Sequence, residues 1–190
     1  MVRLRGLNLY HTIMADPPWK ESGGAEHCKG GKRGADKHYS LMKTDDIIEL
    51  MRTADKWNPA ESCHLWLWVT NNFLVHGLRV VDALGFRYIT NLCWVKDNIG
   101  IGRYLRGKHE LCLFAVRGPS MMPDDHAVPS TVVYVPKSEH SQKPDYVTHF
   151  IERVSPGPRL EMFARGPRPG WDVWGNQTEK YKLELFANGV

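Results

Sequence analysis

The sequence predicts an α/β fold in which a mostly parallel sheet carries helices on both faces, and two observations favour it. Residues 63–70 are almost continuously apolar, which is typical of a strand buried on both faces. A helical pattern at 73–84 and a β-rich run at 88–95 follow. This order of strand, helix and strand generates parallel sheets with right-handed crossovers. The 190 residues predict a single domain.

The first strand is expected at residues 10–15, and it ends abruptly in Asp16-Pro17-Pro18-Trp19. Two successive prolines remove two backbone donors and fix two φ angles, so a stiff, extended segment follows the strand. Open α/β sheets bind their ligands at the carboxyl edge, where this segment is expected to lie.

The residue types of this segment suit a reaction in which an exocyclic base amine attacks. Such an amine is a poor nucleophile because its lone pair is delocalised into the ring. The carboxylate of Asp16 and the carbonyl of Pro17 can accept its two hydrogen bonds, while Trp19 stacks on the base. The alternative is a strand-terminating turn with a half-buried tryptophan, and four residues alone do not separate the two interpretations.

The other elements follow from helix caps, breakers and hydrophobic periodicity. Three helices are expected, the first capped by Thr44-Asp45-Asp46, the second by Asn71-Asn72 and ended by Gly85, and the third opening at 140–145. Further strands are expected at 110–116, at 131–135 on an edge, and at 159–165, with an amphipathic helix at 178–186.

Two glycine-punctuated basic loops are expected at the same sheet edge. Residues 20–38 contain Lys29, Lys32 and Arg33, and residues 97–108 contain Arg103 and Lys108. Basic loops beside a ligand edge are suited to nucleic-acid phosphates. The alternative for both is a solvated surface loop.

The cysteines and the net charge say less about function than the strand-end segment does. Cys28, Cys63, Cys93 and Cys112 are far apart, which suits reduced thiols better than disulfides. His27, Cys28 and His38 invite a zinc site, but no second close-spaced ligand pair accompanies them, and no metal is expected. The net charge of +4 permits a polyanionic partner without requiring one. No signal peptide or membrane span is evident, which predicts a soluble, cytoplasmic protein.

Asp16-Pro17-Pro18-Trp19 resembles the catalytic motif of the adenine N6 amino-methyltransferase family. That family includes the eukaryotic messenger-RNA adenosine N6-methyltransferase and adenine-specific DNA methyltransferases of bacteria and phages. Further stretches look like the same family in the same order, at residues 38–42, 65–70, 94–96, 107–110, 140–145, 160–165 and 170–177. The resemblance implies a Rossmann-like methyltransferase fold, in the permuted order that places the catalytic block before the cofactor block.

The resemblance also implies S-adenosylmethionine as the cofactor and assigns residues by position. Asp16, Pro17, Pro18 and Trp19 match the catalytic segment. Tyr39 matches an aromatic near the acceptor base, with a core tyrosine as the alternative. Lys143 would pair with the cofactor carboxylate, although without the family it would be taken for a surface lysine. The positions that match further cofactor contacts are Asp16, Glu161, Phe163, Arg165, Asn176 and Gln177.

Two departures from the family pattern are visible. Gly166-Pro167-Arg168-Pro169 stands where the eukaryotic enzyme has a histidine and an asparagine, and only about a dozen residues precede the catalytic segment. The sequence predicts methylation of adenine in DNA, with RNA as an alternative substrate and a non-catalytic nucleic-acid-binding partner as another. Without a separate target-recognition domain, a homodimer or a helper subunit is expected to supply binding surface.

Overall fold

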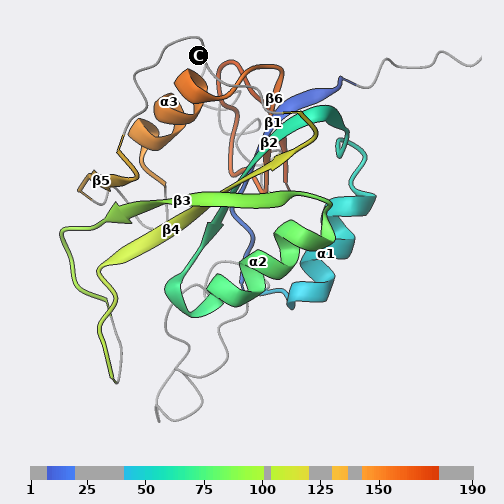
Figure 1. Cartoon of the computed structure of the whole chain (residues 1–190). Helices are drawn as coiled ribbons and strands as arrows, with labels where there is room; N and C mark the ends of the chain where they lie inside the picture. The colour runs from blue at the N-terminus through green and yellow to red at the C-terminus, as the bar shows by residue number, and fades with distance from the viewer. Residues whose placement is uncertain (1–7, 20–40, 101–103, 120–129, 137–142, 176–190) are drawn as a thin grey trace, which may run out of the picture.

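The computed structural model describes residues 8–19, 41–100, 104–119, 130–136 and 143–175. Within them lies one seven-stranded sheet of order β5-β3-β4-β2-β1-β6-β7 (Figure 1). The strands are β1 (Tyr10–Ala15), β2 (Pro59–Val69), β3 (Arg87–Val95), β4 (His109–Arg117), β5 (Val132–Tyr134), β6 (Arg159–Met162) and β7 (Asp172–Trp174).

The predicted mostly parallel sheet is confirmed. β1 pairs in parallel with β2 and β6, β6 with β7, and β3 with β5. Only β4 runs the other way among these strands, antiparallel to both β2 and β3. The ends of six strands and the start of β4 therefore share one edge of the sheet. β5 lies at one border of the sheet, as its short β-branched sequence predicted.

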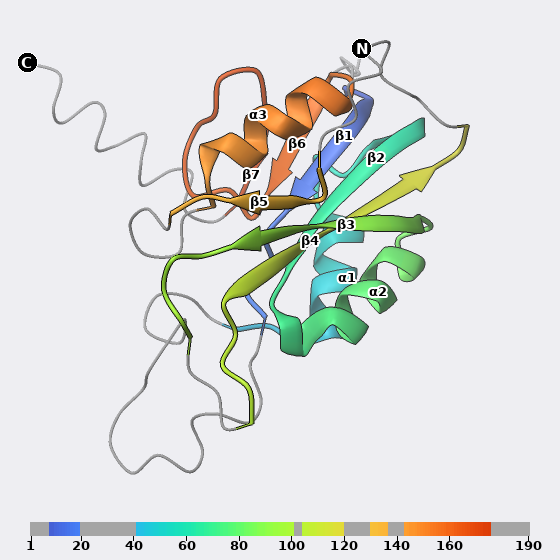
Figure 2. The ribbon, with the colours of Figure 1, turned by 60° about the vertical axis from the view of Figure 1, so that its left-hand side comes forward.

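Helices cover both faces, as predicted (Figure 2). α1 (Thr44–Thr53) and α2 (Leu74–Ala83) lie on one face, and α3 (Asp145–Val154) lies on the other. Successive residues of a strand point to opposite faces. Ile13 accordingly packs in the cluster beneath α1 and α2, and Met14 packs in the cluster that contains Val147 of α3.

Several element boundaries differ from the sequence prediction. Thr44 is the first residue of α1 rather than its N-cap, which is Lys43, and its hydroxyl is hydrogen-bonded to Nδ1 of His76 at 2.9 Å. A 3₁₀ turn at Asn71–Phe73 precedes α2. The strand expected at 159–165 ends at Met162, since Phe163 adopts a φ of 61° that a strand does not allow. The helix expected at 178–186 lies outside the described residues.

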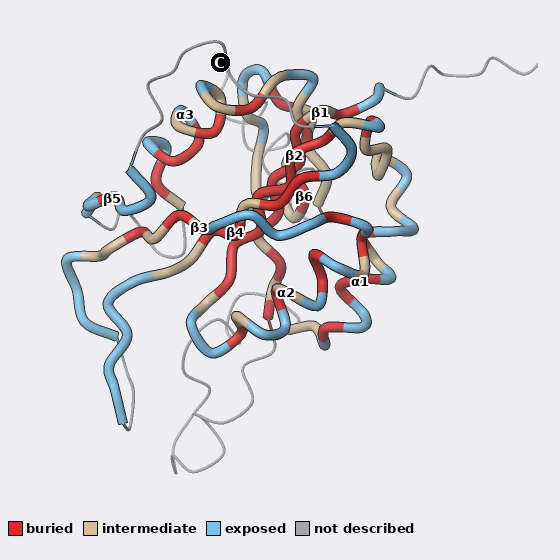
Figure 3. Tube along the Cα trace, viewed as in Figure 1, coloured by how far each residue is buried: buried red, intermediate tan, exposed pale blue. Residues whose placement is uncertain are grey.

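The segment that joins β3 to β4 begins as a paired stem rather than an open loop. The Lys96 N–H donates to the Lys108 carbonyl at 2.8 Å, and the Gly100 N–H donates to the Gly107 carbonyl at 2.7 Å. We call residues 96–108 the arm; residues 101–103 at its tip lie outside the described part. Figure 3 shows the arm exposed along most of its length, and Tyr104 is 100% exposed.

The described cysteines are free thiols, as predicted. Cys63 and Cys112 are buried in the core. Burial raises the pKa of Cys63 to about 12, so this thiol is un-ionised and unreactive near neutral pH. No helix in the described ranges is long and apolar enough to cross a membrane.

Candidate active site

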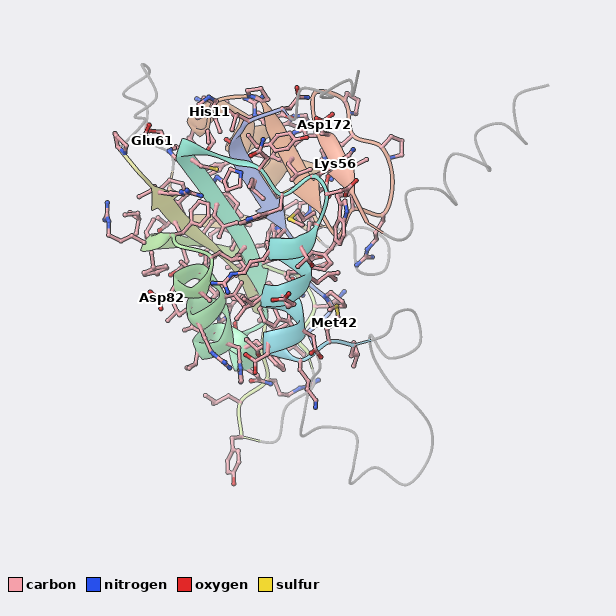
Figure 4. The ribbon with its side chains drawn as sticks, turned by 90° about the vertical axis from the view of Figure 1, so that its right-hand side faces the viewer. His11, Met42, Lys56, Glu61, Asp82 and Asp172 are labelled. Atoms are coloured by element: carbon pink, nitrogen blue, oxygen red, sulfur yellow. The ribbon has the colours of Figure 1, made fainter. Side chains whose placement is uncertain are left out.

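One edge of the sheet gathers four ionisable residues, of which the sequence singled out Asp16 and Lys143 as site residues. Asp16 directly follows β1, and Lys96 directly follows β3. Glu110 is the second residue of β4, which starts where its neighbours end because it is antiparallel to them. α3 begins at the same edge, and Lys143 stands two residues before it. In Figure 4, His11, Glu61 and Asp172 lie at the opposite edge of the sheet. Met42 lies at the same end of the molecule as the edge described here.

The segment after β1 is held by its own backbone. The Trp19 N–H donates to the Pro17 carbonyl at 2.9 Å, and the Met42 N–H donates to the Pro18 carbonyl at 2.8 Å. A carbonyl oxygen has two lone pairs, so that of Pro17 can accept one further hydrogen bond. The Asp16 side chain is 26% exposed and is not turned into the core. The Asp16 carboxylate is therefore partly exposed at the edge, whereas Pro17 is buried and its carbonyl already accepts one hydrogen bond.

Trp19 differs from the sequence prediction. Its ring is only 6% exposed and belongs to the core cluster beneath α1 and α2. The indole N–H donates to the Trp68 carbonyl at 2.9 Å, and the ring packs on Phe73 with centroids 5.6 Å apart. In this arrangement Trp19 anchors the segment that carries Asp16 and does not present a face to a base. A buried indole needs a partner for its N–H, and the Trp68 carbonyl satisfies it.

Lys143 lies between two carboxylates. Its Nζ is 3.0 Å from Oδ1 of Asp16 and 3.1 Å from Oε2 of Glu110, and it stands 5.2 Å from the centroid of the Trp68 ring. Burial alone would lower the pKa of Lys143, but the charges and hydrogen bonds of Asp16 and Glu110 outweigh it and raise that pKa. Lys143 is therefore a cation held in place at neutral pH.

Glu110 is the site residue to which sequence reasoning gave no role. It bonds both Lys143 and Lys96, and Nζ of Lys96 also lies 4.9 Å from the centroid of the Trp94 ring. Burial would raise the pKa of Glu110, but the two lysines outweigh it and lower that pKa. The available signal was its place in the block 107–110, at the start of a strand that begins beside the ligand edge.

The lowered pKa of Glu110 makes folding stability depend on pH. A carboxyl whose pKa is lower in the folded than in the unfolded chain binds fewer protons when folded, so it stabilises the fold above its unfolded pKa. This contribution is lost as the pH falls below about 4.5 and through the folded pKa of Glu110. Urea unfolding between pH 7 and pH 3 should show a smaller acid loss in Glu110→Gln than in the wild type. Equal losses would contradict it.

Glu110→Gln should also impair the site itself. The amide removes the charge that balances Lys96 and Lys143, so Lys143 is left with Asp16 as its one carboxylate neighbour among the described residues. Charge-assisted hydrogen bonds contribute ~1.5–3 kcal/mol, so we expect kcat/KM to fall about tenfold or more. Glu61→Gln is the matched control, because Glu61 is exposed at the opposite edge (Figure 4) and its variant should keep wild-type kinetics.

The predicted cofactor residues after β6 are placed differently from one another. Nη2 of Arg165 lies 4.0 Å from Oδ2 of Asp16, so Arg165 does join the edge. The ring of Phe163 packs edge-on against Trp174, with centroids 5.9 Å apart. Glu161 is bonded to Nε of Arg168 at 2.6 Å. Its carboxylate is therefore already engaged by a guanidinium, which the sequence prediction did not include.

Some predicted residues lie outside the described part of the chain. Lys108 is described and exposed on the arm, where its carbonyl accepts the Lys96 N–H. Those outside the described residues are Lys29, Lys32, Arg33, Tyr39, Arg103, Asn176 and Gln177, together with His27, Cys28 and His38 of the weighed zinc site. Their predicted roles stay predictions.

The charges at this edge suit a zwitterionic ligand beside an amine. Lys143 is a cation positioned to meet a carboxylate, and Asp16 is an exposed acceptor for N–H groups or for a positive centre. The indole N–H of Trp68 and the hydroxyl of Thr70, both at the end of β2, are buried without a hydrogen-bond partner among the described residues. Unpaired buried polar groups cluster at functional sites. The donor set fits the amino-acid portion of S-adenosylmethionine.

Comparison with known proteins agrees with this geometry. The MT-A70 family profile matches residues 10–177. The chain is 27% identical over 195 residues to the type II methyltransferase M.MunI of a Mycoplasma species, covering 95% of this chain and 82% of that protein. It is 30% identical over 194 residues to a putative N(6)-adenosine-methyltransferase MT-A70-like protein of Medicago truncatula, covering 95% of this chain and 28% of that protein.

The human N(6)-adenosine-methyltransferase catalytic subunit METTL3 is 28% identical over 188 residues, covering 93% of this chain and 30% of that protein. The chain thus spans under a third of the length of these plant and human relatives. The family match covers the strand that carries Asp16, the arm, Glu110 and Lys143. The chain therefore belongs to the MT-A70 family of S-adenosylmethionine-dependent adenine N6-methyltransferases.

Proposed function

We propose that this protein transfers a methyl group from S-adenosylmethionine to the N6 amine of adenine in DNA. The observation that carries the proposal is the contact between Lys143 and Asp16, with Nζ and Oδ1 3.0 Å apart. A cation suited to the cofactor carboxylate thus lies directly beside the acid that would face the amine. A non-catalytic scaffold has no need for this pair.

The chain's own residues supply positioning. Lys143 would hold the cofactor carboxylate, and Arg165 would lie on the other side of Asp16. S-adenosylmethionine, when bound, supplies an electrophilic methyl group on a good leaving group. Asp16 and the Pro17 carbonyl would each accept one N–H of the amine and aim its lone pair at that methyl group.

DNA is favoured over RNA by the match to M.MunI, which extends over most of both sequences. The chain covers 82% of M.MunI, a type II methyltransferase, but only 28% and 30% of the Medicago and human adenosine methyltransferases. Type II methyltransferases act on DNA, so the relative that this chain matches over most of its length favours a DNA substrate. The RNA relatives make RNA the second candidate.

The polymer and the modified base can be identified in one experiment. Purified protein is incubated with S-adenosylmethionine and either duplex DNA, single-stranded DNA or RNA, and the digested nucleosides are separated by mass spectrometry. We expect N6-methyldeoxyadenosine. N6-methyladenosine from RNA alone would replace DNA by RNA as the substrate. Calorimetry that detects no binding of S-adenosylmethionine would instead indicate a non-catalytic scaffold.

The arm is proposed to contact the nucleic acid beside the site. It leaves the sheet at Lys96 and returns just before Glu110, so its stem adjoins the ion pair of the site. Its described part exposes Arg106 and Lys108, with Tyr104 fully exposed next to them. Cations can meet phosphates, and an exposed aromatic ring can stack on a base.

Lys108→Ala should therefore weaken nucleic-acid binding without changing cofactor binding. Loss of one phosphate contact reduces the slope of log K against log[salt] by about 1. Fluorescence anisotropy over a range of salt concentrations measures that slope. Arg87→Ala is the control, because Arg87 is an exposed cation at the start of β3, far from the arm. Equal slopes for the two variants would remove Lys108 from the binding surface.

We also propose that a second copy of the chain or a helper subunit completes the nucleic-acid surface. Support comes from the described part of the arm, whose exposed cations beside the site are Arg106 and Lys108, a small cationic surface for a polyanion. Gel filtration combined with light scattering, run with and without a short duplex, tests it. A strict monomer that is fully active on that duplex would contradict the proposal.

A further inference from the structure

The turn between β6 and β7 is tied to α3 at two points. Its backbone closes through the Trp171 N–H, which donates to the Arg168 carbonyl at 3.1 Å, and Gly170 adopts a φ of 75°. Prolines at 167 and 169 flank Arg168 and restrict its backbone. The indole N–H of Trp171 donates to Oε1 of Glu152 on α3 at 2.7 Å. The turn is thus a stiff platform seated on α3.

Arg168 projects from this platform and connects two acids from different elements. Its Nε donates to Oε2 of Glu161, in β6, at 2.6 Å, and its Nη1 donates to Oδ1 of Asp145, the first residue of α3, at 3.4 Å. Glu161 and Arg168 side chains are only 17% and 23% exposed. A planar guanidinium can serve two carboxylates with different nitrogens, whereas an ammonium acts as a point charge.

The two acids lie where the proposed cofactor site needs them. Asp145 stands two residues after Lys143, so fixing the first turn of α3 also fixes the approach of Lys143 to Asp16. Glu161 lies near the end of β6, and in nucleotide-binding α/β folds an acid at such a strand end is suited to ribose hydroxyls. The Arg168 side chain therefore links the part of the site predicted to hold the cofactor's ribose with the part predicted to hold its amino-acid portion.

We propose that Arg168 is a positioning residue that sets the geometry of the cofactor site by bridging Glu161 to the start of α3. This inference rests on the proposed function. It assigns a role to the Gly166-Pro167-Arg168-Pro169 segment, which departs from the pattern of the eukaryotic relatives. Without Arg168, the partly buried Glu161 carboxylate would lose its guanidinium partner and turn toward solvent.

Calorimetric titration with S-adenosylhomocysteine tests the role directly. We expect Arg168→Ala to raise the Kd about tenfold to hundredfold, and Arg168→Lys to fall between it and the wild type, since a lysine can hold only one acid well. Cofactor KM should rise more than kcat falls. Arg79→Ala is the matched control, because it removes an exposed Arg79–Asp45 ion pair between α1 and α2 and should leave the Kd unchanged.

A double-mutant cycle with Glu161→Gln separates positioning from general destabilisation. If Arg168 acts through Glu161, the double variant should bind S-adenosylhomocysteine with about the same Kd as whichever single variant binds it less tightly. Additive losses, or a wild-type Kd in Arg168→Ala, would overturn the inference. If thermal melting shows that Arg168→Ala does not fold, an unchanged Kd in Arg168→Lys would overturn it instead. A wild-type protein that binds no S-adenosylhomocysteine would refute the proposed function, not the bridge.

Discussion

Asp16→Ala should lower methyl transfer about a thousandfold, while S-adenosylmethionine should still bind within a few-fold of the wild-type affinity. This is the largest effect that we expect. Asp16 directly follows β1 with its side chain partly exposed, and its two oxygens face Lys143 and Arg165. Removing a preorganised acceptor at a reacting centre costs on the order of a hundredfold to a thousandfold in kcat, and loss of the acceptor that aims the nucleophile should lie at the upper end.

Tritiated methyl incorporation into DNA, with calorimetric binding of the cofactor, measures both halves of this prediction. Asp16→Asn adds a sharper comparison because it keeps the shape and one carbonyl acceptor while removing the charge. Asp172→Asn serves as the control, since Asp172 lies near the opposite edge (Figure 4), where its carboxylate accepts a bond from the Tyr10 hydroxyl. Turnover retained in Asp16→Ala would refute the assigned role.

Lys143→Met should cause the second largest effect, a loss of cofactor affinity of about a hundredfold. The methionine keeps most of the side-chain volume but removes the ammonium from between Asp16 and Glu110. The two carboxylates then repel each other, and the cofactor carboxylate meets no cation at this position. Two charge-assisted contacts of ~1.5 kcal/mol each would account for a loss of this size.

The same substitution should lower the free energy of unfolding. Breaking a fully buried ion pair costs ~3–5 kcal/mol. The Lys143 side chain is 20% exposed, so solvent screening reduces that figure, and we expect about 1–3 kcal/mol. Urea unfolding at pH 7 measures it, and calorimetry with S-adenosylmethionine measures the affinity. Lys56→Met is the control, because Lys56 bonds the Val173 carbonyl away from the site. Unchanged affinity in Lys143→Met would exclude Lys143 from cofactor binding.

Much of the fold followed from local sequence patterns. The apolar run of β2 and the amphipathic patterns of α1, α2 and α3 determine which residues are buried, and they predicted a mostly parallel sheet covered on both faces. The antiparallel direction of β4 was not predicted, because strand direction depends on pairing with partners that are distant in the sequence. Glu110 escaped notice for the same reason, since only that direction brings the start of β4 to the ligand edge.

The roles of the site residues also depended partly on local sequence and partly on the tertiary structure. The residue types and order of Asp16-Pro17-Pro18-Trp19 predicted a ligand edge, because a strand end followed by prolines constrains the backbone locally. The catalytic role of this segment and the cofactor role of Lys143 came from the family resemblance. Only the tertiary structure showed that Trp19 packs in the core, that Lys143 forms ion pairs with two carboxylates and that Arg168 donates a hydrogen bond to Glu161. Ion pairs and aromatic packing join residues far apart in the chain, and their partners are chosen by how the elements pack and not by any neighbouring residue.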